Sequence, residues 1–176
     1  MTTSATAPAV LDTERGDLLA MLGKARFFLR FTVRNLTDEQ ARQRSTASEL
    51  TLGGLIKHVA GTERGWADFL VDPSSMKDMD AMTEADFAAR DTEFQLLPDE
   101  TLADVLAAYQ QVADRTDALV GTVDLNAELT LPAAPWFQER AWSARRVLMH
   151  IVAETTQHAG HADIIRESLD GQKTMG

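Results

Sequence analysis

The spacing of apolar residues is the feature that most constrains the fold of this chain. Apolar side chains recur every three or four residues over four long stretches, residues 12–34, 52–70, 100–120 and 142–169. We find no convincing strand-like alternation and no internal repeat. Because an amphipathic helix buries its apolar side against other helices, the pattern predicts an all-α protein, a four-helix bundle with long connections.

The connections and helix ends carry further predictions. We expect a short helix over residues 83–94, within a linking segment that spans residues 72–98. Residues 121–140 contain glycine and proline and lack a helical period, so they are predicted to form a long connection. We expect Thr51 to cap the start of the second long helix and Gly171 to mark the end of the fourth.

The composition excludes several classes of function. The chain has no cysteine, which rules out disulfides, thiolate metal ligands and a protein thiol nucleophile. A formal net charge of −10 repels phosphate backbones, so we expect no nucleic-acid partner. The sequence lacks an apolar run of about 18 residues and a signal peptide at its start, so we expect no membrane association and a cytoplasmic location.

The length of 176 residues fits one hydrophobic core. We therefore predict one four-helix-bundle domain over residues 11–176, preceded by a short disordered arm over residues 1–10.

The fourth stretch carries three of the four histidines of the chain. The ideal helical period places polar side chains on the apolar stripe that the bundle is expected to bury: Glu154, His158 and His161, beside Val147, Ile151 and Ile165. A buried carboxylate is costly unless something compensates its charge. A divalent metal would do so, and the spacing of Glu154 and His158 directs both groups to one point.

The spacing of Glu154 and His158 also has an ordinary explanation, because such pairs on helices often form local hydrogen bonds. Three imidazoles on one buried stripe are harder to explain by packing alone. The remaining histidine, His58, lies at the flank of the apolar stripe of residues 52–70. It could reach the cluster on the fourth helix or lie half-exposed on the surface, and the periodicity does not distinguish the two.

Two segments taken together, LGGLIKHVAGTERGW and MHIVAETTQHAGHADIIRE, resemble the DinB/YfiT-like superfamily of metalloenzymes over residues 12–171. The resemblance implies a four-helix bundle in which one histidine of the second long helix and two ligands of the last helix hold a metal. Carried over by position, the ligands are His58, Glu154 and His158. The glutamate makes the set similar to that of the branch with mycothiol-dependent maleylpyruvate isomerase and the mycothiol S-transferases. That isomerase has an additional C-terminal domain, which this sequence does not contain, so its reaction stays open.

The resemblance implies a metal-dependent S-transferase that activates a low-molecular-weight thiol as a metal-bound thiolate, which attacks an electrophile. We expect zinc, with nickel, manganese or iron as alternatives. Mycothiol is the preferred thiol, because arginine outnumbers lysine by 13 to 4, a bias typical of high-GC genomes such as those of actinobacteria. A homodimer is left open.

Two other functions fit the same residues. One is a metal-dependent hydrolase, and the other is a bundle that binds a metal or small molecule without catalysis. A catalytic site needs an open cavity beside the metal, whereas a structural site is closed by a fourth protein ligand, for which His150 or His161 is available.

Several other side chains have competing interpretations. We expect His161 to lie beside the metal ligands and His150 to bind a local carbonyl or carboxylate. Arg166 could contact a substrate carboxylate beside the metal, but pairing with Asp163 or Glu167 is the simpler prediction. Glu63 is expected at the surface, paired with Arg64, Arg145 or Arg146, and the alternative is an acid beside the metal ligands. Trp66, Trp136 and Trp142 are expected to be packing residues, and Trp136 is the best candidate of the three for a cavity rim.

Overall fold

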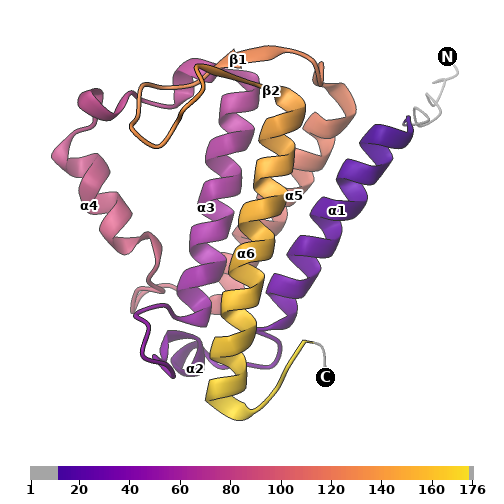
Figure 1. Ribbon diagram of the computed structural model, residues 1–176. Helices are drawn as coiled ribbons and strands as arrows, with labels where there is room; N and C mark the ends of the chain where they lie inside the picture. Colours follow the sequence, from indigo (N-terminus) through magenta and orange to yellow (C-terminus); the bar gives the residue numbers. More distant parts are fainter. Residues whose placement is uncertain (1–11, 175–176) are drawn as a thin grey trace, which may run out of the picture.

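The computed structural model describes residues 12–174, except for the side chain of residue 91, and shows a four-helix bundle (Figure 1). The bundle helices are α1 (Thr13–Phe31), α3 (Leu52–Val71), α5 (Leu102–Thr122) and α6 (Ala144–Asp170). Each packs against two others, in the cyclic order α1, α6, α3, α5. The predicted all-α bundle is confirmed. The predicted arm over residues 1–10 lies outside the described residues.

Side chains cap the helices at or near the predicted ends. The Thr51 hydroxyl accepts a hydrogen bond from the Gly54 amide at the start of α3, as predicted. Ser143 is the N-cap of α6 and lies just before the first residue of the helix. Gly171 ends α6 in the left-handed conformation with φ of 79°, which glycine adopts without steric cost.

Two sets of short elements were not predicted from the spacing of apolar residues. The first is α2 (Asp38–Arg42), which begins with a reciprocal capping box between Thr37 and Gln40. The second is an antiparallel pair of strands, β1 (Glu128–Thr130) and β2 (Ala141–Ser143), with Leu129 opposite Trp142. The expectation of no strand is therefore wrong, because strands of three residues are too short to show an alternating pattern.

A polar layer divides the core into two apolar clusters. The layer consists of Arg26, Glu63, Tyr109 and Thr155, all buried. Arg26 donates two hydrogen bonds to Glu63, at 3.2 Å from Nε and 2.5 Å from Nη2. Glu63 is 1% exposed, so its prediction as a surface residue is wrong. The signal for its burial was present, since it lies four residues after Val59 on the apolar stripe of α3.

The predicted short helix is α4 (Glu84–Glu93), which stands apart from the bundle on the side of α3 (Figure 1). Two short 3₁₀ helices precede it, Pro73–Ser75 and Met79–Ala81. The C-terminal end of α4 approaches α3 closely, because a Cβ atom on Gly54 would lie 1.8 Å from the carbonyl oxygen of Phe94. Glycine at this position therefore allows the end of α4 to rest on α3.

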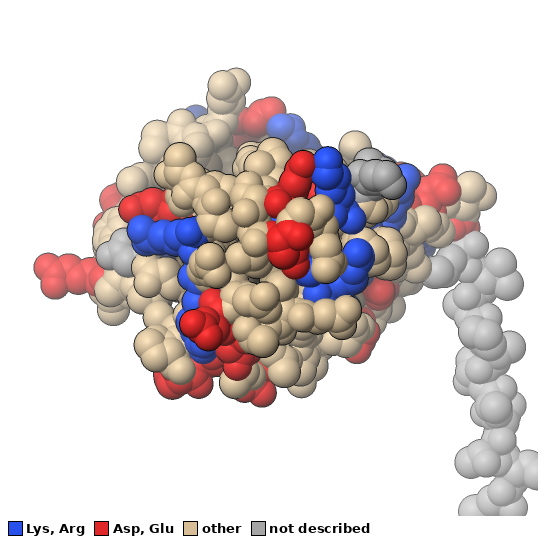
Figure 2. Space-filling view, turned by 90° about the horizontal axis from the view of Figure 1, so that it is seen from below, with Lys and Arg blue, Asp and Glu red and all other residues tan. Residues whose placement is uncertain are grey.

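The surface carries charges of both signs. On the end of the bundle seen in Figure 2, lysine and arginine side chains lie next to aspartate and glutamate side chains. None of the described helices is both long enough and apolar enough to cross a lipid bilayer.

Candidate metal centre

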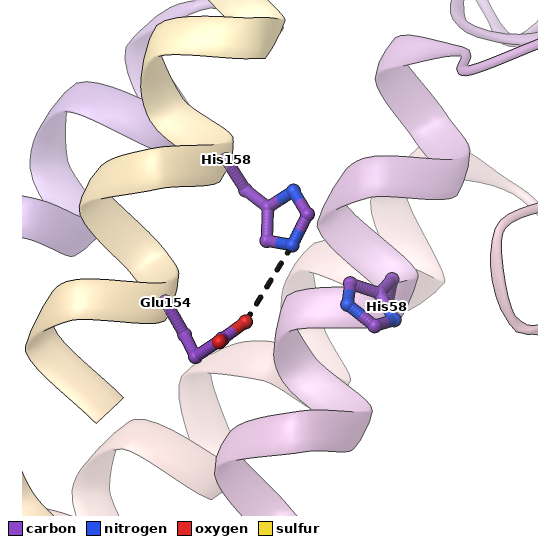
Figure 3. A group of neighbouring side chains, drawn as sticks. All are labelled: His58, Glu154 and His158. Atoms are coloured by element: carbon purple, nitrogen blue, oxygen red, sulfur yellow. Dashed lines mark ion pairs between the residues drawn. The ribbon is translucent and has the colours of Figure 1, made fainter. Parts of the chain in front are cut away.

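The bundle brings His58, Glu154 and His158 together (Figure 3). His58 comes from α3, and the other two residues come from successive turns of α6. One ligand atom from each residue lies within 4.8 Å of those of the other two. The Nε2 atom of His158 is 3.7 Å from Oε2 of Glu154. Two imidazoles and one carboxylate therefore converge on one small volume, with the ligand types that zinc and related dications accept.

Glu154 and His158 lie at the edge of the buried stripe of α6. Its centre is formed by Ile151, Thr155 and Ala159. The side chains of Glu154 and His158 are 30% and 12% exposed. The expectation that they lie within the buried stripe is therefore only approximate, because ideal helical angles do not resolve the centre of a stripe from its edge. A position at the edge directs them past the core, toward α3 and the space beyond it.

Burial affects the ionisation of His158. Removal from water lowers the pKa of its imidazole, and the neighbouring His58 lowers it further. The carboxylate of Glu154 acts in the opposite direction. The net effect keeps His158 neutral at pH 7, and neutral imidazole is the form that binds metals.

Glu93 and Phe94 hold the ring of His58. The Nδ1 atom of His58 is 2.7 Å from Oε1 of Glu93, and the Phe94 ring stacks on the imidazole with 3.8 Å between centroids. Metal-binding histidines commonly donate their second ring nitrogen to a carboxylate in this way. Glu93 was not predicted from the sequence, because no periodicity links the end of a short surface helix to a histidine 35 residues away.

His161 and His150 lie on either side of the group along α6. The Nδ1 atoms of His161 and His158 are 3.4 Å apart, so His161 lies beside the ligand set as expected. His150 is enclosed by the rings of Trp66 and Trp142, and its Nε2 atom is 3.8 Å from Oε1 of Glu154. Its carboxylate neighbour is thus Glu154.

Arg166 does not reach the site. It is 3% exposed, and it donates to the carbonyl oxygens of Thr32 and Arg34 at the C-terminal end of α1. Its acidic partner is Asp170, at 2.9 Å. The predicted pairing with Asp163 or Glu167 is therefore wrong. Arg166 therefore joins α6 to α1, and its candidacy beside the metal ligands is not supported by its position.

A cavity of about 860 Å³ opens beside the three side chains. His58, His150 and Glu154 line its inner wall, and α4 together with the connections before it and before β2 forms the outer wall. Trp136 lies at this outer wall with 53% of its surface exposed, in agreement with its predicted place at a cavity rim. Trp66 and Trp142 are buried and stacked on one another, as packing residues.

A family model described as mycothiol-S-transferase matches residues 17–171. The chain belongs to the mycothiol-S-transferase family. A search of curated proteins finds no match. The matched region includes nearly all of α1 and the whole of the other bundle helices, so it also contains all three residues of the candidate metal centre.

Membership of the mycothiol-S-transferase family confirms the resemblance inferred from the sequence. It indicates mycothiol S-transferase activity in general, with a small-molecule thiol as a partner. The large cavity beside the convergent side chains provides space for such a molecule.

Proposed function

We propose that this protein is a metal-dependent S-transferase that joins mycothiol to an electrophilic carbon, with zinc as its metal. The observation that carries the proposal is the convergence of His58, Glu154 and His158 beside a large open cavity, whose wall includes His58 and Glu154. Three protein ligands leave a coordination position for a substrate, which is the arrangement of catalytic rather than structural zinc sites.

The residues present fit a dication. Two imidazoles and one carboxylate form a ligand set of borderline hardness, which suits zinc and also nickel, manganese or iron. The hydrogen bond that His58 donates to Glu93 orients the imidazole ring and leaves its other nitrogen for a metal. Glu154 compensates one of the two charges of the ion.

A dication bound by these residues would activate a thiol, because a thiol held by a dication loses its proton at neutral pH. The reacting sulfur must come from such a small-molecule thiol, because the chain has no cysteine of its own. In the reaction proposed, the mycothiol sulfur forms a bond to the electrophilic carbon, the leaving group departs with the bonding electrons, and the thiol proton passes to water. The inner wall of the cavity positions the thiol, and the outer wall faces the second substrate.

The test begins with the metal content of the purified chain, followed by calorimetric titration of the zinc-loaded protein with mycothiol and with glutathione. We expect about one dication per chain and selective binding of mycothiol. Both should be lost in His158→Ala. The matched control is Gln157→Ala, because Gln157 is exposed on the same helix, next to His158.

The outcomes separate the candidate functions. Zinc binding without thiol binding overturns the transferase and favours a metal-dependent hydrolase or a binding protein. Failure to take up zinc, nickel, manganese or iron after reconstitution overturns the metal site itself. Equal losses in His158→Ala and Gln157→Ala would show that the substitutions act through general damage to α6.

A further inference from the structure

We propose that Arg90 binds a carboxylate of the electrophilic substrate, so that the preferred electrophile is an apolar, aromatic monoanion. This inference rests on the proposed transferase function, and it concerns the wall of the cavity that α4 forms. It is carried by the pairing of charges in the cavity and by the side chains next to Arg90.

Most charged groups that line the cavity are already paired. Lys77 is 2.8 Å from Asp86, Glu93 is 2.7 Å from His58, and Glu154 lies beside two histidines. Within residues 12–174, Arg90 has no ion pair, although it lines the same cavity. Of the two lysine and arginine residues described in this lining, Lys77 is paired and Arg90 is not. The guanidinium of Arg90 is available to an anionic ligand.

Several neighbours of Arg90 are apolar. Its guanidinium carbon lies 5.9 Å from the centre of the Trp136 ring. The outer wall also includes the side chains of Met76, Met79, Met82 and Phe137. Hydrogen bonds between Met79 and Ala133 and between Asp78 and Ala133 join its two connections into one surface. Methionine and aromatic side chains make adaptable surfaces for flat, polarizable molecules.

The charge balance favours a single negative charge on the ligand. A guanidinium presents two parallel donors that match a carboxylate. The nearby carboxylates Asp86, Glu93 and Glu154 line the same cavity and would repel a doubly charged phosphate. Mycothiol carries sugar hydroxyls and amides in place of carboxylates, so Arg90 is left for the second substrate.

The test compares 4-chloro-3,5-dinitrobenzoate with its neutral amide as substrates of the zinc-loaded protein and mycothiol. In both reactions the thiol sulfur bonds to the ring carbon, chloride leaves with the electron pair of the carbon–chlorine bond, and the thiol proton passes to the buffer. We expect the wild type to prefer the benzoate in kcat/KM, after correction for the uncatalysed rates. Arg90→Gln should reduce this preference about tenfold, as expected for the loss of a charge-assisted hydrogen bond, with little effect on the amide.

Two variants serve as controls. Arg90→Lys keeps the positive charge but loses the paired donors, so it should retain part of the preference. Arg64→Gln removes an exposed arginine of α3 that does not line this cavity, so it should leave the preference unchanged. An equal loss of preference in Arg64→Gln and Arg90→Gln would overturn the specific role of Arg90 in favour of a general effect of the protein's charge.

A second readout needs no turnover. Calorimetry measures the binding of the unreactive pair 3,5-dinitrobenzoate and 3,5-dinitrobenzamide to wild type and to Arg90→Gln. A preference for the benzoate that disappears in Arg90→Gln supports the inference, even when neither chloro compound reacts. The lack of any reaction would overturn the proposed transferase function alone. Turnover of both chloro compounds with a preference unchanged in Arg90→Gln overturns the inference alone. A preference that survives in Arg90→Gln but vanishes on chelation places the carboxylate on the metal and also overturns it.

Discussion

At the scale of single residues, Glu93 connects a surface helix to the proposed metal ligand His58. The hydrogen bond of 2.7 Å fixes which ring nitrogen of His58 faces the other ligands. We predict that Glu93→Gln weakens zinc binding at least about tenfold while the fold is retained. Titration against a competing chelator measures the change. Glu84→Gln, an exposed substitution in the first turn of the same helix, should bind zinc as the wild type does, and equal affinities in all three proteins would contradict the role of Glu93.

Glu63 has a different role, because its carboxylate compensates a buried arginine. The side chain of Arg26 is 6% exposed and that of Glu63 is 0% exposed. We predict that Glu63→Gln destabilises the bundle by about 3 kcal/mol, since removal of one partner leaves a buried charge incompletely paired. Urea unfolding measures the difference.

The control is Glu139→Gln, which breaks the ion pair with Arg146, in which both side chains are 48% exposed. Exposed pairs contribute about 1 kcal/mol or less. A loss in Glu63→Gln no larger than the loss in Glu139→Gln would show that Asp117, which also pairs with Arg26, compensates the buried arginine without Glu63.

The sequence indicated the site better than it indicated the polar layer. Helical spacing indicated Glu154 and His158 as candidate ligands, and the family resemblance added His58. The spacing of Glu63 indicated its burial but not its partner, and Glu93 was missed, because the partner of each lies on another element, Arg26 on α1 and His58 on α3. Helical periodicity describes one element at a time, so it cannot identify a contact between elements.

At the scale of elements, the junction of α3 and α4 depends on Gly54. A Cβ atom there would meet the carbonyl oxygen of Phe94 at 1.8 Å, and backbone cannot turn aside as a flexible side chain does. We predict that Gly54→Ala destabilises the protein by about 1–3 kcal/mol and weakens zinc binding, because Glu93 and Phe94 are displaced from His58. Thermal unfolding and zinc titration measure the two effects.

Gly23→Ala provides the matched control on α1, where a Cβ atom meets nothing within 4 Å. Alanine in an open helical position should stabilise the protein by about 0.5–1 kcal/mol. If Gly54→Ala also stabilised the protein, the close contact of α3 and α4 would not exist in solution.

The long helices could be predicted because each carries many turns of apolar spacing, and their ends carry recognisable caps. The short elements could not. α2 has five residues and each strand has three, so their formation depends on tertiary contacts such as the burial of Leu129 and Trp142 rather than on a repeated local pattern.

At the scale of the whole molecule, the proposed metal links two helices of the bundle, since its ligands come from α3 and α6. A ligand that binds only the folded state stabilises it by about 2.7 kcal/mol at a hundredfold excess over its dissociation constant. We predict a corresponding rise in melting temperature with zinc over a chelated sample, and no rise in His58→Ala. A rise of the same size in His58→Ala would place the stabilising zinc elsewhere.

The candidate ligands and the outer wall of the cavity come from different parts of the chain. The ligands lie on packed bundle helices, whereas the outer wall comes from the connections around α4 and before β2. Connections accept substitutions and changes of length that packed helices do not. Descendants of one ancestral bundle can therefore diversify the molecules they accept while they inherit the same three ligands, and a mutant library confined to those two connections would sample new acceptors with the helical scaffold unchanged.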